Sequence, residues 1–319
     1  MKPSEKNKHT NFLKEQAQLL GFDFCGISKA EKLSTEEQNL SDWLSKGYHG
    51  KMAWMDNHFD KRLNPAELVP GAKSVVSLMY NYYPGNEGSL NPTHRVARYA
   101  YGKDYHNVIK EKLRSLLSIL RNEIGDFAGR AFVDSAPIME RQWAARSGLG
   151  WLGKNTLLLN KERGSYFFLA ELVIDLELDY DLPIRDYCGS CTRCIDACPT
   201  EAILEGGILD ASRCISYLTI ELKEAIPDEF KGKTGNWIFG CDICQEVCPW
   251  NRFSKAHDEP EFQLTDGIRK LASGAWRDIT EEVFNKVFRY SPLKRTKYQG
   301  IMRNITFLST GVNDQERTD

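Results

Sequence analysis

The sequence lacks the features of a membrane-spanning, secreted or strongly basic protein. No apolar run approaches the ~20 residues that a helix needs to cross a bilayer, and no apolar stretch follows the positively charged start MKPSEKNKHT. The 319 residues carry 42 Lys and Arg against 44 Asp and Glu, so the net charge is −2. We therefore expect a cytoplasmic protein without a membrane partner, in which any contact with nucleic acid is confined to a local basic face.

Several cofactor signatures are also missing. No Gly-x-Gly-x-x-Gly run follows a strand and opens a helix, so a Rossmann site for a nicotinamide or flavin cofactor is unsupported. The chain has no Cys-x-x-Cys-His haem motif, and no Cys-x3-Cys-x2-Cys run of the radical-SAM type lies outside its eight clustered cysteines. The Asp-x-His-x-x-Gly run through which some cobalamin proteins ligate cobalt by histidine is absent as well. A large organic cofactor must therefore be held by dispersed contacts.

Cysteine, in contrast, is abundant and clustered. Eight of the nine cysteines fall between residues 188 and 248. In a cytoplasmic chain such a dense block indicates metal binding rather than disulfides. The ninth, Cys25, lies in the apolar segment GFDFCGIS, where we expect a buried and unreactive thiol.

Both cysteine runs have the spacing of a bacterial two-cluster ferredoxin. The first is Cys-x2-Cys-x2-Cys-x3-Cys-Pro, and the second is Cys-x2-Cys-x3-Cys-Pro with its first member displaced to Cys214. In this pattern the last cysteine of a run ligates the other cluster. Two zinc ribbons would also use eight cysteines, but zinc sites favour paired Cys-x-x-Cys knuckles. We predict two 4Fe–4S clusters, one held by Cys188, Cys191, Cys194 and Cys248 and the other by Cys198, Cys214, Cys241 and Cys244.

The rest of the chain alternates between helical and strand patterns. Apolar residues at helical spacing cover 10–20, 104–121 and 137–147, with Thr10 and Asp104 placed to cap the first two helices. Aromatic and β-branched runs predict strands at 21–28, 73–83, 129–134 and 165–178. The fold class is therefore expected to be α/β, with a central sheet. We predict an α/β domain over 1–183, a ferredoxin-like module over 184–255 and a helical segment over 256–319.

Several segments resemble the epoxyqueuosine reductase family. They are ARYAYGKDYH (97–106) and FVDSAPIMERQWAARSGLGWLGKNTLLL (132–159), together with GYHGKMAWM, LVPGAKSVVSLMYNYYP and the two cysteine runs. The resemblance runs from about residue 10 to about residue 300. Many members continue into a HEAT-like C-terminal region, so we expect any tRNA contacts made there to be absent or reduced in this chain.

The resemblance implies a fold, a reaction and two kinds of cofactor. Family members resemble reductive dehalogenases, with a nitroreductase-like α/β core that holds base-off cobalamin (B12) beside two 4Fe–4S clusters. They reduce the epoxide of epoxyqueuosine, at the wobble position of certain tRNAs, to the olefin of queuosine. The reaction consumes two electrons and two protons and releases water. The expected partners are tRNA carrying epoxyqueuosine and an electron donor such as ferredoxin or flavodoxin, and we expect a monomer.

The resemblance also selects candidate site residues. Asp134 is the candidate proton donor; burial beside a corrin should raise its pKa so that it stays protonated near neutral pH. From its sequence position Asp134 could equally cap the following helix. The predicted cobalamin contacts, each of which could instead be an ordinary turn, helix or solvated residue, are Asn57, Ala97, Tyr105, His106, Arg141, Lys154, Asn155, Ser216 and Gly240.

A basic stripe lies near the C-terminus. Residues 286–303, KVFRYSPLKRTKYQGIMR, contain no acidic residue and interleave two tyrosines with the cations. Phosphate contact combined with base stacking uses such a pattern, although a solvated helix surface has it too. The predicted tRNA contacts are Lys223, Arg289, Lys294, Arg295 and Lys297. The alternative functions are a reductive dehalogenase-like enzyme acting on a small molecule and a ferredoxin-type electron-transfer subunit.

Overall fold

A four-stranded antiparallel sheet forms the centre of the molecule. The computed structural model describes residues 4–85, 93–271 and 275–312. The strand order is β1–β2–β7–β4, with bounds Phe24–Lys29 for β1, Ser74–Asn81 for β2, Gly129–Phe132 for β4 and Phe167–Ile174 for β7. Every residue of β2 is buried, because this strand has a neighbour on each side and a helical layer over each face.

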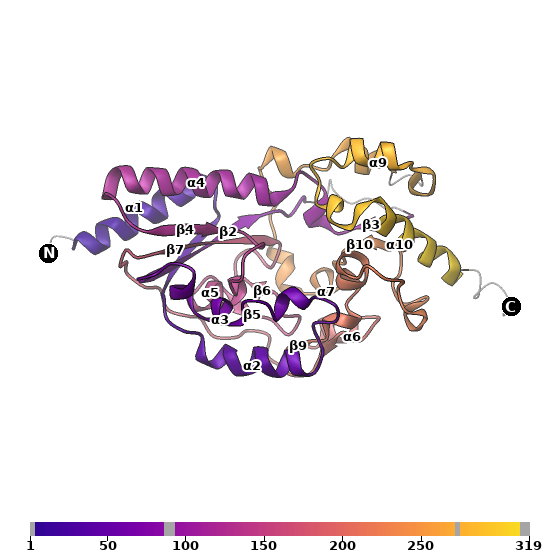
Figure 1. The fold of residues 1–319 in the computed structure, drawn as a ribbon, viewed down its shortest axis with the longest axis horizontal. Coiled ribbons are helices and arrows are strands. Elements are labelled where there is room, and N and C mark those ends of the chain that lie inside the picture. Colours follow the sequence, from indigo (N-terminus) through magenta and orange to yellow (C-terminus); the bar gives the residue numbers. More distant parts are fainter. Residues whose placement is uncertain (1–3, 86–92, 272–274, 313–319) are drawn as a thin grey trace.

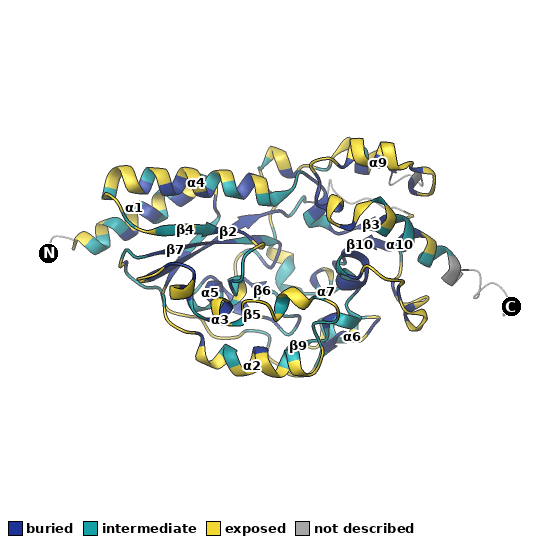
Figure 2. Cartoon of the chain, viewed as in Figure 1, coloured by how far each residue is buried: buried dark blue, intermediate teal, exposed yellow. Residues whose placement is uncertain are grey.

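Helices cover both faces of this sheet, as Figure 1 shows. One layer consists of α1 (Glu5–Leu19) and α4 (Tyr105–Ile124), whose apolar stripes pack on the sheet. The other layer contains α2 (Ser34–Ser45), α3 (Phe59–Leu63) and α5 (Glu140–Arg146). Buried residues line the inner sides of the helices and exposed residues their outer sides (Figure 2). The predicted α/β fold class is confirmed.

The helix starts agree with the sequence in one case and differ in two. Asp104 caps α4 as predicted, since its side chain accepts a hydrogen bond from the His106 backbone N–H. The Thr10 cap is wrong: α1 begins earlier, behind Ser4, and Thr10 lies inside the helix with its hydroxyl donating to Lys6 O at 2.9 Å. Helix α5 begins at residue 140 instead of 137, and no side chain caps it. Asp134 is therefore not a helix cap.

The cysteine block folds into short elements beside this core. Helices α6 (Arg193–Asp196) and α7 (Ile243–Glu246) each lie within one cysteine run and contact each other. A π-helix over Tyr217–Glu221 begins three residues after Cys214. The remaining short strands are β5 (Trp151–Leu152) paired with β6 (Leu158–Leu159), β8 (Ile203–Leu204) paired with β9 (Ile208–Leu209), and β10 (Trp237–Phe239) paired in parallel with β3 (Arg95–Val96). The ferredoxin-type module is thus joined to the α/β core through the β3–β10 pair.

The C-terminal segment packs on this same pair of strands. It contains α8 (Asp266–Leu271), α9 (Glu281–Val287) and α10 (Lys297–Val312). Trp276, Phe284 and Phe288 share an apolar cluster with Val96 of β3 and Phe239 of β10. The hydrophobic core therefore crosses the boundary that the sequence predicts at residue 256. Within the described ranges, no helix is both long and apolar enough to span a membrane.

Candidate functional site

Asp134 lies just beyond the end of β4 and faces the first turn of α4. Its backbone adopts a left-handed conformation, with φ of 52°. The Tyr105 hydroxyl donates to Asp134 Oδ2 at 2.5 Å, and His106 Nε2 lies 3.2 Å from the same oxygen. The Asp134 side chain remains 50% exposed. Tyr105 and His106 therefore hold one side of the Asp134 carboxyl group, and its other side is open to solvent.

His106 is held between two carboxylates. Its Nδ1 lies 2.7 Å from Asp104 Oδ1, while its Nε2 faces Asp134. Carboxylates only accept hydrogen bonds, so both ring nitrogens must donate and the ring must be protonated. Burial lowers the pKa of His106, but the hydrogen bonds and charges of Asp104 and Asp134 outweigh it and raise the pKa to about 9. The ring is an imidazolium at neutral pH.

The same contacts reverse the expected ionisation of Asp134. Burial raises its pKa, but the hydrogen bonds from His106 and Tyr105 and the charge of Arg295 lower it more, so its pKa falls below the ordinary value. The contacts of the chain's own residues thus lower the pKa of Asp134, and the raised pKa expected beside a corrin stays a prediction. The proton that the sequence assigns to Asp134 resides on His106, hydrogen-bonded to the Asp134 carboxylate.

An ion pair from two other parts of the chain lies close to Asp134. Arg295 donates through Nε to Glu221 Oε1 at 2.8 Å. The charge of Arg295 acts on both Asp134 and Tyr105. Arg295 belongs to the C-terminal segment and Glu221 to the π-helix of the cysteine module, so all three parts of the chain meet at this site.

The eight clustered cysteines form two neighbouring groups. All of them are free, partly buried thiols. Burial raises the pKa of Cys194, and the nearby thiols of Cys248 and Cys188 raise it further. Burial likewise raises the pKa of Cys241, which lies near the thiols of Cys214 and Cys244. The groups that approach one another are those that the ferredoxin spacing predicts.

A cavity of about 230 Å³ opens at the first cysteine group and fits a cluster site. Its lining includes all four predicted ligands of the first cluster, Cys188, Cys191, Cys194 and Cys248. The Trp151 indole N–H donates to Cys188 Sγ at 3.4 Å. Lys154 and Asn155 also line this cavity, and Lys154 Nζ donates to Gly189 O at 2.8 Å and to Cys191 O at 2.9 Å. Both residues therefore lie at the first cysteine group, and their role as cobalamin contacts stays a prediction.

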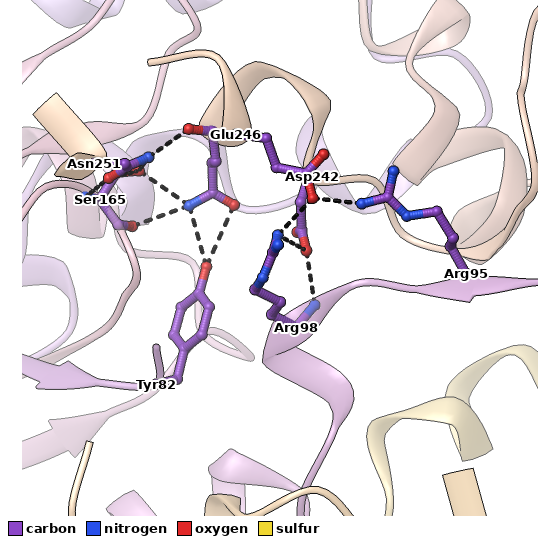
Figure 3. Close-up of polar contacts among 8 residues, drawn as sticks. Tyr82, Arg95, Arg98, Ser165, Asp242, Glu246 and Asn251 are labelled. Atoms are coloured by element: carbon purple, nitrogen blue, oxygen red, sulfur yellow. Dashed lines mark hydrogen bonds and ion pairs between the residues drawn. The ribbon is translucent and has the colours of Figure 1, made fainter. Parts of the chain in front are cut away.

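Helix α7 of the second cysteine run is tied to the core by a buried polar network (Figure 3). Arg98 donates through its backbone N–H and its guanidinium to Asp242 Oδ2, at 2.9 and 3.2 Å. Arg98 also pairs with Glu246, at 2.8 Å. Arg95 pairs with the same carboxylate. The Asp242 side chain is only 3% exposed and sits next to Cys241. This network fixes the position of the second cysteine group relative to the α/β core.

The second cysteine group lies on the side of Asp134. Cys241 packs with Ala97 and Tyr99 in one apolar cluster, and Tyr99 contacts Tyr105, with ring centroids 6.2 Å apart. Gly240 has φ of 69°, and a Cβ on it would lie 2.5 Å from the Ala97 side chain. Ala97 and Gly240 are both buried against each other, and they shape the backbone between the cysteine group and the tyrosines.

The other predicted cobalamin contacts are more scattered. The Ser216 side chain lies close enough to the Cys214 thiol to lower its pKa, although burial raises that pKa more. Arg141 lies near Asp134 and donates to Thr156 O at 2.6 Å. Asn57 is exposed, and its side chain makes none of the hydrogen bonds found in the described parts of the chain. The structure thus brings Tyr105, His106 and Arg141 to Asp134 but leaves Asn57 outside this group.

The predicted tRNA contacts are all exposed. Lys223 lies close enough to Arg295 and Lys297 for their charges to act on it. Arg289 lies at the other end of the stripe, beside Tyr290, whose carbonyl accepts from the Asp104 N–H at 2.6 Å. Lys294 bonds to Asn285 on α9. The basic stripe therefore borders the Asp104–His106–Asp134 row.

Sequence reasoning missed three acidic residues of this site. Asp104 was predicted only as a helix cap, yet it also holds His106. Glu140 Oε1 accepts from the Asp134 N–H at 2.5 Å. Glu171 lies fully buried on β7, within the apolar run SYFFLAELVIDLEL. A single acid in the middle of an otherwise apolar buried strand is a signal that the sequence does contain.

Two family models match the chain. "Epoxyqueuosine reductase QueG, DUF1730" matches residues 62–135, which end just after Asp134. "4Fe-4S double cluster binding domain" matches residues 187–251 and so covers both cysteine runs. These matches support the iron–sulfur interpretation of the cysteines over zinc.

Curated relatives and solved structures match over nearly the whole chain. An epoxyqueuosine reductase of Cyclobacterium marinum is 62% identical over 94% of this chain and 97% of its own length, and one of Pseudomonas aeruginosa is 44% identical over 96% and 86%. The structure of an epoxyqueuosine reductase with an epoxyqueuosine-modified tRNA-Tyr stem loop has a TM-score of 0.87 at 33% identity, covering 97% of this chain and 83% of that one. The Bacillus subtilis enzyme with its catalytic aspartate loop swung out of the active site gives the same values. The chain belongs to the epoxyqueuosine reductase family.

Proposed function

We propose that this chain reduces epoxyqueuosine in tRNA to queuosine. The observation that carries the proposal is the row of Asp104, His106 and Asp134, which holds a proton beside the second cysteine group. Removal of an epoxide oxygen as water requires both electrons and protons, and the site supplies a route for each. Family membership supports the same substrate, because a relative's structure contains an epoxyqueuosine-modified tRNA stem loop.

The proton arises from the pair formed by His106 and Asp134. The imidazolium donates to Asp134 Oδ2, and the Tyr105 hydroxyl donates to the same oxygen. As negative charge develops on the departing epoxide oxygen, the half-exposed Asp134 carboxyl is the group placed to pass on the proton that His106 holds. In the Bacillus subtilis relative, a structure shows a catalytic aspartate loop swung out of the active site, which agrees with a catalytic role for Asp134 here.

The electrons enter through the first cysteine group and leave from the second. The first group lines a cavity bordered by Arg193 and Arg252, where an electron donor such as ferredoxin or flavodoxin can approach. The second group packs near Tyr99, on the side of Asp134. Cys194 and Cys244, one from each group, are close enough for their charges to interact, so the two clusters are neighbours.

Cobalamin is the cofactor that we propose between the second cluster and the substrate. When bound and reduced it supplies a strong nucleophile or electron donor. The chain offers partly exposed hydrogen-bonding groups for such a ligand in Ser216, Tyr105 and His106, and these fit the amide fringe of a corrin. Ala97 and Gly240 are both buried, so they would support this surface from behind and would not contact the corrin.

The tRNA docks on the basic residues that border the site. Lys223, Arg295 and Lys297 supply positive charge near Asp134 without a strongly basic protein being required. We further propose that the protein acts in the cytoplasm as a monomer.

Nucleoside analysis of tRNA tests the function. Cells that lack the protein should accumulate epoxyqueuosine, and the wild-type chain should restore queuosine. An Asp134→Asn variant should keep its iron content yet fail to restore queuosine, because the amide cannot carry the proton. Unchanged queuosine in the deletion strain would refute the proposal.

A further inference from the structure

Glu171 is an acidic side chain without any solvent exposure. It lies on the central strand β7, paired with Ser77 of β2 and Phe132 of β4. Among the described residues, no donor group hydrogen-bonds to either carboxyl oxygen of Glu171, and the buried Ser77 hydroxyl also has no partner. Burying a carboxylate without a hydrogen-bond donor costs free energy, so another group must stabilise the Glu171 side chain.

The carboxyl group of Glu140 is the group that stabilises Glu171. Glu140 opens α5, and its carboxyl lies within hydrogen-bonding reach of the Glu171 carboxyl. Two carboxylates can only accept, so a hydrogen bond between them requires one shared proton. Burial, and next the charge of Asp134, raises the pKa of Glu140, and burial followed by Glu140 raises the pKa of Glu171 well above its ordinary value.

Glu140 also holds the backbone of Asp134. Its Oε1 accepts the Asp134 N–H at 2.5 Å. Asp134 has a φ of 52°, a left-handed conformation that a residue with a side chain adopts only when its surroundings hold it there. A hydrogen bond to an ionised acceptor is stronger than a neutral one, so an anionic Glu140 is the form that holds this loop best.

We propose that Glu140 and Glu171 share one proton and together position the Asp134 loop against α4. In this arrangement Glu171 is the protonated partner and donates to Glu140, and Glu140 accepts from Glu171 and from the Asp134 backbone. Both are positioning residues, since they act through Asp134. The effect of this pair on catalysis depends on the proposed function, whereas its effect on the position of the loop does not.

The charges around the pair determine its response to pH. Asp134 and Arg141 face Glu140, while Glu140 and Asp134 face Glu171. Loss of the shared proton leaves Glu140, Glu171 and Asp134 as three neighbouring anions. The cations beside them are Arg141 at Glu140, and His106 and Arg295 at Asp134. Repulsion between the two ionised glutamates should loosen the Asp134 loop at alkaline pH, once Glu171 loses its proton.

Two variants separate the two members of the pair. In Glu171→Gln the amide donates to Glu140 at every pH, so the loop should stay in place without a titratable proton. In Glu140→Ala the acceptor of the Asp134 N–H is gone, so the loop should be loose at every pH. Glu259→Gln is the matched control, because this carboxylate binds Tyr80 and Lys112 and neither member of the pair.

Hydrogen exchange of the cluster-containing protein measures the position of the loop without turnover. The reference is the His58 loop, where φ is also positive, at 60°. Relative to it, protection of the Asp134 amide should fall at alkaline pH in the wild type and in Glu259→Gln but persist in Glu171→Gln. In Glu140→Ala it should be lower by about 10- to 100-fold at all pH values, the effect of one hydrogen bond to a charged group.

The activity assay and the hydrogen-exchange measurement distinguish a failure of the positioning role from a failure of the proposed function. With epoxyqueuosine tRNA, Glu140→Ala should lower kcat by a similar factor and leave KM nearly unchanged. Wild-type protection that does not change between pH 6 and 10, or a Glu171→Gln variant as unprotected as Glu140→Ala, would overturn the inference. A wild-type protein with the expected exchange pattern but no turnover would overturn the proposed function and support the positioning role.

Discussion

Replacement of His106 by glutamine tests where the catalytic proton resides. Glutamine can still donate a hydrogen bond to Asp104 or Asp134, but it carries no proton that can be released. If the proton belongs to the His106–Asp134 pair, the wild-type rate should depend on the pKa of His106. If it belonged to a neutral Asp134 alone, the rate would depend on a carboxyl pKa instead.

The magnitude follows from the environment of His106. Its pKa rises from 6.5 to about 9, a difference of 2.5 units, which at ~1.36 kcal/mol per unit corresponds to about 3 kcal/mol in favour of the charged ring. Because the pKa is raised, the proton is fully present at neutral pH and is lost as the pH increases through 9. The wild-type rate should therefore be flat around pH 7 and fall about tenfold per unit above pH 9.

Single-turnover reduction of an epoxyqueuosine tRNA stem loop from pH 6 to 10 provides the assay. His106→Gln should lose about 10²- to 10⁴-fold in rate, as is typical for a positioned acid, and the decline near pH 9 should disappear. Asp104→Asn removes one of the two carboxylates beside His106, so its decline should move to lower pH by about one unit. This variant keeps the proton carrier and is the graded control.

Two results would refute the reasoning. A wild-type rate that falls above pH 6 to 7 would assign the proton to a neutral Asp134. A His106→Gln variant with the wild-type rate and pH profile would show that the imidazolium takes no part in the reaction.

Three further predictions concern the clusters, the buried network and the basic face. Cys248→Ser and Cys241→Ser should each lower the iron content by about half, because each removes a ligand of a different cluster; loss of all iron in both would contradict separate sites. Arg98→Met should destabilise the protein by about 3–5 kcal/mol in denaturant unfolding, since the buried Asp242 would lose its guanidinium partner and keep only the backbone N–H of residue 98; a change within experimental error would contradict the role of this ion pair. Arg295→Gln should weaken tRNA binding and reduce the salt slope by about 1; an unchanged slope would place the phosphates elsewhere.

The sequence was sufficient where the chemistry is encoded over short distances. Cluster ligands follow fixed spacings, so the two cysteine groups could be assigned from the runs alone, and the thiols that the fold brings together are those of the assignment. The four strands of the central sheet lie in mostly apolar runs, so their positions were predicted to within a few residues. The unreactive Cys25 followed from its apolar segment, and burial indeed raises its pKa to about 12.

Contacts between segments far apart in the chain could not be predicted from the sequence. Lys154 and Asn155 resemble residues near a flat cofactor, yet their loop folds onto the first cysteine group. Glu140 and Glu171 are 31 positions apart in the chain, and only the packing of α5 on β7 brings them together. A short-range pattern carries no information about such pairs, because their partners are chosen by tertiary packing.

The sequence by itself determined which groups this protein has: eight cysteines at ferredoxin spacing, an aspartate after a strand and a local basic stripe. Only the tertiary structure decided the charge that each group carries. Packing of α4 beside the end of β4 brings His106 and Tyr105 onto Asp134, and their hydrogen bonds stabilise the carboxylate more than burial penalises it. Ionisation depends on distances of a few ångströms between segments far apart in the chain, and folding alone sets those distances.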